Sequence, residues 1–194
     1  MKDFMTKQIY FAGPRLSGVD YEIYARHISK KYRGAGIRLV LPNDGGAQSS
    51  EHIYKTNLNR IKSCDAVIAD LNPFRGEIEP DCGTAFECGF AAALGKPIIA
   101  IVEDQRTLVQ KMQDSSLGCI KENGAYRSDE GDLIEDYGYP LNLMLFQANG
   151  KIVTSLDEAI RYFALRYQGV KKQHIKNTQA KHRQKNSVVC PIPS

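Results

Sequence analysis

Acidic residues cluster after one apolar run of this sequence. The run 66–70 ends in Asp70, and four more carboxylates follow at Glu77, Glu79, Asp81 and Glu87. A pair of carboxylates can break a glycosidic bond, because one attacks the anomeric carbon while the other protonates the leaving group. The segment is therefore a candidate site for glycosidic chemistry.

Glu87 has the most apolar neighbours of these carboxylates, because it stands between Phe86 and Cys88 in a predicted helix. A carboxylate in apolar surroundings is costly unless it is used or paired. Each residue also has a structural interpretation: Asp70 as a loop cap, Asp81 as the N-cap of the helix, and Glu87 as the partner of a Lys or Arg. Spacing alone leaves both interpretations open.

Motifs for other ligands are weak. The segment 83–89 does not match G-x-G-x-x-G, and Gly95-Lys96-Pro97 stands at a helix end, so we expect neither a P-loop nor a nicotinamide site. His27 and His52 stand alone, and the five cysteines include no Cys-x-x-Cys pair. We therefore expect no zinc site and no disulfide framework.

Five short apolar runs alternate with longer amphipathic segments, which is typical of a parallel sheet flanked by helices. We expect strands over 8–12, 37–41, 66–70, 97–102 and 151–154. Helices are expected over 20–33, 51–63, 83–94 and 155–167. This order predicts an α/β fold with a flavodoxin-like, doubly wound, five-stranded parallel sheet, whose ligand binds beyond the carboxyl ends of the strands.

The segment 103–139 carries the weakest signal. It contains one plausible short helix, 106–113, and a Gly- and acid-rich stretch, 122–136. We expect a long loop there that is functional or mobile. We expect an ordered segment again at 142–146.

The formal net charge of +4 comes from 26 basic and 22 acidic residues, and its excess lies at one end of the chain. Six basic residues and no acidic ones stand in 169–194, which leaves 20 basic against 22 acidic over 1–168. We expect one domain over 1–168 and a disordered basic tail over 169–194, without the aromatic interleaving of a nucleic-acid binder. No apolar stretch approaches the roughly 20 residues of a membrane span, so we expect a cytoplasmic protein without membrane contact.

Four blocks occur in order along 8–154, and the block Asp-x-Gly-Thr-x-x-Glu at 81–87 is the most specific of them. The blocks are Ile9-Tyr10-Phe11-Ala12-Gly13-Pro14, Asp65-Ala66-Val67-Ile68-Ala69-Asp70-Leu71, the stretch 81–91 with Gly95-Lys96-Pro97, and Asn142-Leu143-Met144-Leu145. Together they resemble the nucleoside 2-deoxyribosyltransferases. The resemblance implies transfer of 2-deoxyribose from one nucleobase to another through a covalent glycosyl-enzyme, without a metal or cofactor.

The resemblance also implies roles for single residues. Glu87 would be the nucleophile, and Tyr10 would orient its carboxylate by a hydrogen bond. Asp70 and Asp81 would be the carboxyls on the base side, one of which protonates the departing nucleobase. Two close carboxyls do not easily ionise together, so a shared proton would supply an acid near neutral pH.

Three further residues are expected at the substrate. Asn142 would reach into a neighbouring subunit to hold the sugar hydroxyls, which makes the protein a homo-oligomer. Phe11 is expected either to stack on the nucleobase or to be an ordinary core residue, and Gly13 forms the turn at the strand end. The expected partners are 2′-deoxynucleosides and free nucleobases.

Two alternatives remain. A hydrolase of deoxynucleoside 5′-monophosphates would use the same carboxylates and would need a phosphate cradle, for which Arg15, Ser17 and Gly18 are candidates. A non-catalytic nucleotide-binding module is the other. The long segment 103–140 departs from the usual pattern of the family and is a candidate lid or interface element.

Overall fold

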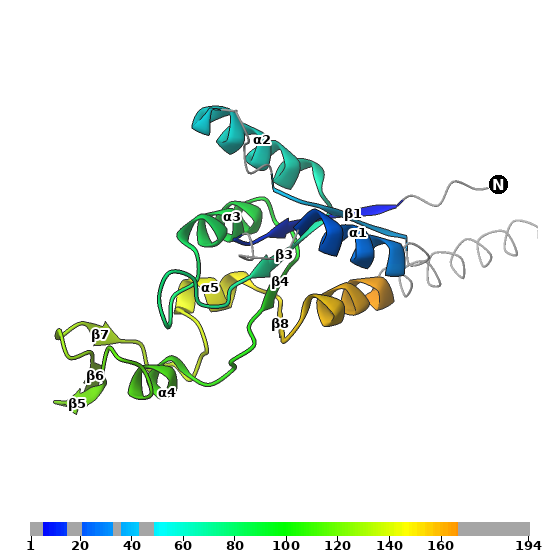
Figure 1. Cartoon of the computed structure of the whole chain (residues 1–194). Coiled ribbons are helices and arrows are strands. Elements are labelled where there is room, and N and C mark those ends of the chain that lie inside the picture. The colour runs from blue at the N-terminus through cyan, green and yellow to red at the C-terminus, as the bar shows by residue number, and fades with distance from the viewer. Residues whose placement is uncertain (1–5, 15–20, 33–35, 43–48, 167–194) are drawn as a thin grey trace, which may run out of the picture.

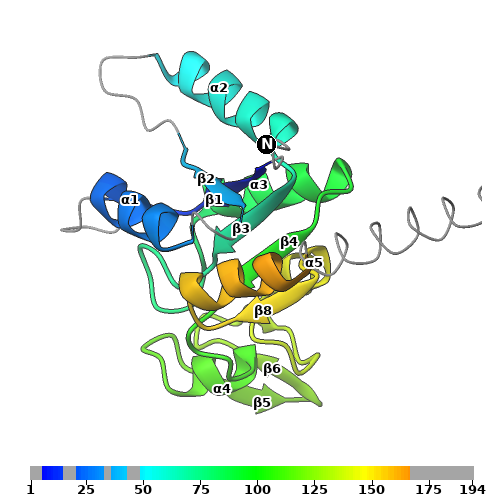
Figure 2. The ribbon, with the colours of Figure 1, turned by 90° about the vertical axis from the view of Figure 1, so that its right-hand side faces the viewer.

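A five-stranded parallel sheet forms the centre of the computed structural model, which describes residues 6–14, 21–32, 36–42 and 49–166. Its strands lie in the order β2-β1-β3-β4-β8 (Figure 1 and Figure 2). They are β1 (Lys7–Ala12), β2 (Ile37–Val40), β3 (Ala66–Asp70), β4 (Ile98–Ile101) and β8 (Lys151–Val153). All four neighbouring pairs are parallel. This is the strand order of flavodoxin-like folds, with its switch point between β1 and β3, and it confirms the predicted fold.

Helices cover both faces of this sheet (Figure 2). One face is covered by α1 (Tyr21–Lys31) and by the helix 156–166. The other is covered by α2 (Ser50–Ser63), α3 (Cys82–Ala93) and α5 (Leu143–Ala148). The predicted strands and helices of this part differ from the observed ones by no more than two residues at either end.

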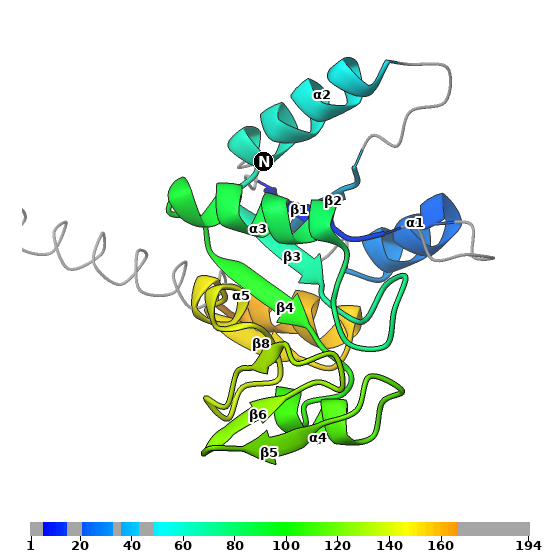
Figure 3. The ribbon, with the colours of Figure 1, turned by 90° about the vertical axis from the view of Figure 1, so that its left-hand side faces the viewer.

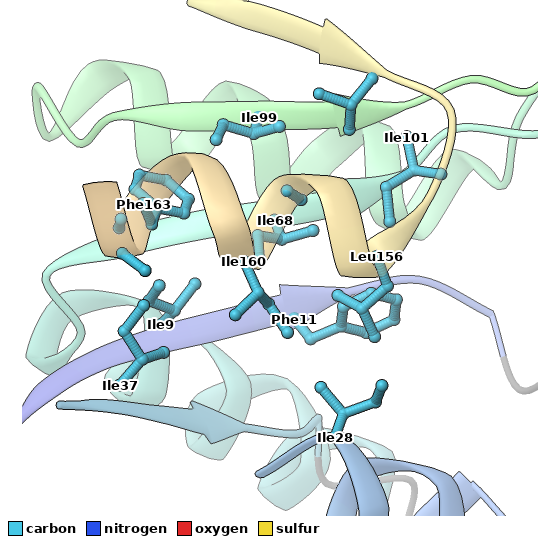
Figure 4. Close-up of a cluster of buried hydrophobic side chains, with 14 residues drawn as sticks. Ile9, Phe11, Ile28, Ile37, Ile68, Ile99, Ile101, Leu156, Ile160 and Phe163 are labelled. Carbon is cyan, nitrogen blue, oxygen red and sulfur yellow. The ribbon is translucent and has the colours of Figure 1, made fainter. Parts of the chain in front are cut away.

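The helix 156–166 closes the first face of the sheet. Leu156, Ile160 and Phe163 point from it toward the strands (Figure 4). They meet the side chains that alternate onto this side of β1, β3 and β4, namely Ile9, Phe11, Ile68, Ile99 and Ile101. Burial on both faces explains why the strands read as continuous apolar runs rather than as alternating patterns.

Small residues bring α3 close to the second face. The cluster there joins Tyr10 of β1 and Ile61 of α2 to Cys88 and Ala91 of α3, all at most 2% exposed. Asp81 caps α3, and Gly95 follows it with φ 65°, a left-handed conformation that glycine adopts without strain. The helix that carries Glu87 is therefore fixed at both ends.

The segment 103–140 is an ordered lobe rather than the long loop that the sequence predicts. It contains α4 (Leu108–Gln113) and a three-stranded antiparallel sheet of β5 (Ile120–Glu122), β6 (Ala125–Arg127) and β7 (Leu133–Ile134). The lobe lies beyond the β8 side of the main sheet (Figure 3). Its small core joins Leu108, Val109, Met112 and Ile134 to Ile78 of the preceding loop. The lobe strands are short, and their sequences IKE, AYR and LI contain neither a long apolar run nor a periodic pattern that would have indicated them.

Some predictions fall on residues outside the described ranges. These are the basic tail 169–194 and the candidate phosphate cradle at Arg15, Ser17 and Gly18. In the described part of the chain, no helix is both long and apolar enough to span a bilayer.

Candidate active site

Tyr10 and Glu87 meet between the sheet and α3. The Tyr10 hydroxyl donates a hydrogen bond to Glu87 Oε1 at 2.6 Å. The Tyr10 side chain is fully buried and lies two residues before the end of β1, on the side that faces α3. A hydrogen bond from a fixed, buried donor restricts the orientation of the Glu87 carboxylate, and it is the contact that the sequence resemblance implies.

Glu87 lines a cleft of about 570 Å³ at the carboxyl-end edge of the sheet. Gly13 and Pro14 after β1 form one side of it, and α2, the start of α3 and the loop after β3 form the others. The lining residues are Gly13, Pro14, Pro42, Ile53, Tyr54, Asn57, Leu58, Phe74, Arg75, Asp81, Gly83, Thr84, Phe86 and Glu87. A cleft in this place is the usual ligand site of an open α/β sheet.

Asp81 lies in this cleft and is also the N-cap of α3. Its Oδ2 accepts hydrogen bonds from the backbone N–H of Thr84 at 2.9 Å and from the Thr84 hydroxyl at 3.2 Å. The structural role foreseen for Asp81 is therefore present. Because both hydrogen bonds end on Oδ2, the cap does not require Oδ1, and Asp81 can serve the helix and the cleft together.

Asp70 lies beside the cleft but not among its lining residues. Its Oδ1 accepts hydrogen bonds from the backbone N–H and the side-chain amide of Asn72, at 3.2 and 2.8 Å. Asn72 in turn accepts the backbone N–H of Glu103 at 2.8 Å. A Cβ atom at Gly13 would lie only 3.0 Å from the Asp70 Cβ, so glycine permits the close approach of the two strand ends. Asp70 thus holds the loop after β3, directly behind the Gly13 turn.

Phe11 is a core residue, 3% exposed, on the opposite face of the sheet from Tyr10. Side chains alternate along a strand, so consecutive residues of β1 cannot both face α3. Of the two roles foreseen for Phe11, the structure favours that of an ordinary strand residue.

Asn142 is not among the residues that line the cleft of Glu87. It caps α5, where its Oδ1 accepts the backbone N–H of Met144 at 2.9 Å and its Nδ2 donates to Glu135 Oε1 at 2.8 Å. It lines a second cavity of about 380 Å³, between the lobe and the loop 71–81, and not the cleft of Glu87. A role in this chain's own cleft does not follow from its position.

The cleft contains residues that sequence reasoning missed. Tyr54 of α2, Phe86 of α3, and Phe74 with Arg75 of the loop all line it. Arg75 has a positive φ of 60°, and its guanidinium lies 4.6 Å from the centre of the Phe74 ring. A left-handed conformation at a residue other than glycine marks local strain. The adjacency of Phe86 to Glu87 was the available signal, because the turn of a helix can place both at one opening.

Asp81 and Glu87 are the carboxylates that line this cleft. Burial, and then the charge of Glu87, raise the pKa of the Cys88 thiol to about 12, so Cys88 stays protonated and is a poor nucleophile. In the described residues, no group of three or more His, Cys, Asp or Glu side chains is placed to hold a metal ion.

Comparison with known proteins identifies relatives of this arrangement. A family profile described as nucleoside 2-deoxyribosyltransferase matches residues 9–144. A solved 2-desoxiribosyltransferase from Leishmania mexicana is 38% identical, covers 81% of this chain and 97% of its own, and superposes with a TM-score of 0.65. A conserved protein from Enterococcus faecalis is 25% identical, covers 84% of this chain and 99% of its own, and has a TM-score of 0.54.

Curated proteins match over shorter segments. The 5-hydroxymethyl-dUMP N-hydrolase of Rattus norvegicus is 29% identical over 106 residues, which are 50% of this chain and 61% of that enzyme. An uncharacterized protein of Schizosaccharomyces pombe is 34% identical over 90 residues, 42% of this chain and 43% of its own. The chain therefore spans about half the length of the curated relatives that it matches.

Proposed function

This chain belongs to the nucleoside 2-deoxyribosyltransferase family, and from that premise we propose that it exchanges the nucleobase of 2′-deoxynucleosides through a covalent 2-deoxyribosyl-Glu87 intermediate. The observation that carries the proposal is the hydrogen bond from Tyr10 to Glu87 at the wall of a cleft that Asp81 also lines. The likeness to the Leishmania mexicana protein over 97% of its length favours transfer over hydrolysis.

In the first half of the reaction, a Glu87 oxygen attacks C1′ of the deoxyribose while the bond from C1′ to the base nitrogen breaks. Tyr10 holds the carboxylate so that one oxygen faces the anomeric carbon. Asp81, as the carboxyl in the cleft, gives a proton to the departing nucleobase. The products are a glycosyl ester on Glu87 and a free base.

In the second half, a nitrogen of the incoming base attacks C1′ and the bond to Glu87 breaks. The base loses a proton to Asp81, which restores both carboxyl groups. Two inversions give overall retention at C1′. Asp70 contributes by holding the loop after β3 in place beside Gly13. Asn142 completes the site of a neighbouring subunit in a homo-oligomer.

A trapping experiment tests the role of Glu87. Incubation with a 2-fluoro-2-deoxynucleoside is expected to leave a sugar adduct on the peptide that contains Glu87, detected by mass spectrometry, because fluorine slows the second half-reaction. Glu87→Gln should show no adduct, while the matched Glu79→Gln variant should keep it. Base exchange that persists in Glu87→Ala would show that the nucleophile is misassigned.

Hydrolysis of deoxynucleoside 5′-monophosphates is the second candidate, and two observations favour it. The rat relative is named as an N-hydrolase of a deoxynucleotide, and Arg75 places a cation in the cleft. A substrate comparison separates the two activities. Deoxyinosine with adenine should yield deoxyadenosine if the chain is a transferase, whereas release of base from deoxynucleotides alone would favour the hydrolase. In that second case, Arg75→Gln should weaken nucleotide use selectively.

A further inference from the structure

Two aromatic rings from different helices meet on the wall of the cleft. Tyr54 of α2 and Phe86 of α3 have their ring centres 6.1 Å apart, with an angle of 38° between the ring planes. Both line the cleft, and yet Tyr54 is 53% exposed and Phe86 50% exposed. Large apolar side chains that stay half-exposed inside a concave site are typical of ligand contacts.

The position of this pair fits one part of the substrate. Phe86 directly precedes Glu87 in α3, so the aromatic surface begins beside the attacking carboxylate. Ile53 and Leu58 of α2 extend the same wall with apolar surface. The sugar must sit at Glu87 for the reaction, which leaves the flat, uncharged end of a nucleoside to meet the wall.

The aromatic ring that the sequence suggested for stacking on the nucleobase does not line the cleft. Phe11 is buried on the far face of the sheet, in the cluster that the helix 156–166 covers (Figure 4). A stacking surface for the base must therefore come from elsewhere, and Tyr54 and Phe86 are exposed rings in the cleft.

We propose that Tyr54 and Phe86 form the platform on which the nucleobase stacks. This proposal depends on the proposed function in one respect, namely that the ligand carries a nucleobase. Stacking uses the π-face that every base possesses, so the platform accepts purines and pyrimidines alike. It holds the base in the ground state and in the transition state to a similar extent. The pair therefore acts through affinity for the base and not through the chemical step.

The test measures binding of a free base and turnover in parallel. Tyr54→Leu is the main variant, because it lies on a different helix from Glu87, and Tyr54→Phe keeps the ring. Base–aromatic stacking is worth about 1 to 3 kcal/mol, which corresponds to a loss of about 5- to 150-fold in adenine affinity by calorimetry for Tyr54→Leu. KM for the deoxynucleoside should rise in the same proportion, with kcat within about threefold of wild type. Tyr54→Phe should restore both.

Tyr137→Leu is the matched control, because Tyr137 is a 61% exposed tyrosine of the lobe that does not line the cleft. It should bind adenine as wild type does, and equal loss in this variant would overturn the proposal. Unchanged adenine affinity in both Tyr54→Leu and Phe86→Leu would also overturn it. If wild type forms no adduct on Glu87 but loses adenine binding with Tyr54→Leu, the transferase assignment fails while the platform stands.

Discussion

The buried Tyr10 hydroxyl donates a hydrogen bond to the Glu87 carboxylate and restricts its orientation. Tyr10→Phe removes this donor and keeps the ring that packs against α3, so the fold should persist. A hydrogen bond to a charged group is worth about 1.5 to 3 kcal/mol, which predicts a fall in kcat of about 10- to 150-fold. Single-turnover kinetics with a deoxynucleoside check this prediction. A variant with full kcat would mean that other contacts orient Glu87.

Asp81 offers a way to separate a structural role from a chemical one. Asparagine is as good an N-cap as aspartate, so Asp81→Asn should leave the free energy of unfolding nearly unchanged, whereas Asp81→Ala should lose about 1 kcal/mol. The amide of Asn is too weak an acid to protonate the departing base, and Ala has no acidic group, so both variants should lose base exchange by about 100-fold or more. Urea unfolding and exchange assays on the two variants make the comparison. Exchange at the wild-type rate in Asp81→Asn would assign the acid elsewhere.

For single residues, the sequence predicts a contact between two family blocks better than it predicts which face of the sheet a side chain points to. The family resemblance carried by the blocks that contain Tyr10 and Glu87 was enough to foresee the hydrogen bond. The sequence did not decide between the two roles left open for Phe11 and for Asp70. The position of Phe11 depends on which face of the sheet its side chain points to, and that of Asp70 depends on the close approach of the strand ends that Gly13 permits. Tyr54 gave no signal, because one aromatic residue in a predicted amphipathic helix does not by itself indicate a ligand contact.

Among the elements, the helix 156–166 shows that the fold extends past the family match at 9–144. Ile160 is 1% exposed against β1 and β3, so Ile160→Ala should cost about 2 to 5 kcal/mol of unfolding free energy. Leu165→Ala is the control on the same helix, because Leu165 is 66% exposed and should change stability by no more than about 0.5 kcal/mol. Urea titration measures both. Equal, small effects would place this helix outside the cooperative domain.

The contact between the lobe and the loop 71–81 carries a pH-dependent cost. Burial, and then the charge of Glu135, raise the pKa of Glu79 above its usual value. A raised pKa means that ionisation of Glu79 is less favourable in the folded state than in the unfolded state. Below the unfolded pKa of about 4.3 the carboxyl is neutral in both states and does not change the free energy of unfolding. As the pH rises through the pKa of the folded state, the carboxyl ionises and the free energy of unfolding falls. Glu79→Gln should therefore raise Tm at pH 7 and not at pH 4.

The expected rise is small, about 1 °C, because Glu79 is exposed to solvent that screens its charge. Calorimetry at both pH values measures it. Glu122→Gln removes an exposed carboxylate from β5 of the same lobe and is the matched control. A gain of the same size at pH 4 would assign the effect to packing and not to ionisation.

The lobe itself illustrates why elements differ in how well a sequence predicts them. Four of the five strands of the main sheet are four to six residues long and β8 has three, and all five were predicted within a residue at each end. The lobe strands have two or three residues, and β5 is exposed throughout. These strands are stabilised by pairing with each other and by the core that contains Ile78 and Met112. Both are tertiary contacts, which a local sequence pattern does not predict.

For the whole molecule, the separate positions of Asn142 and Glu87 lead to a prediction about assembly. If Asn142 serves the site of a neighbour, each complete site draws on two chains. A mixture of two inactive variants can then regain activity, because a heterodimer contains one site built from the intact residue of each partner. Glu87→Ala removes the nucleophile. Asn142→Ser removes the amide and keeps a side chain that can cap α5.

Equal amounts of the two variants, unfolded together and refolded, should recover about a quarter of the wild-type exchange rate, since half the dimers are mixed and each has one intact site. Each variant refolded alone should stay inactive. The measurement is base exchange from deoxyinosine to adenine, with Tyr137→Leu replacing Asn142→Ser as a control that should give about half the wild-type rate, since half of its sites keep Glu87. No recovery in the mixed sample, with dimers present by light scattering, would place Asn142 outside the shared site.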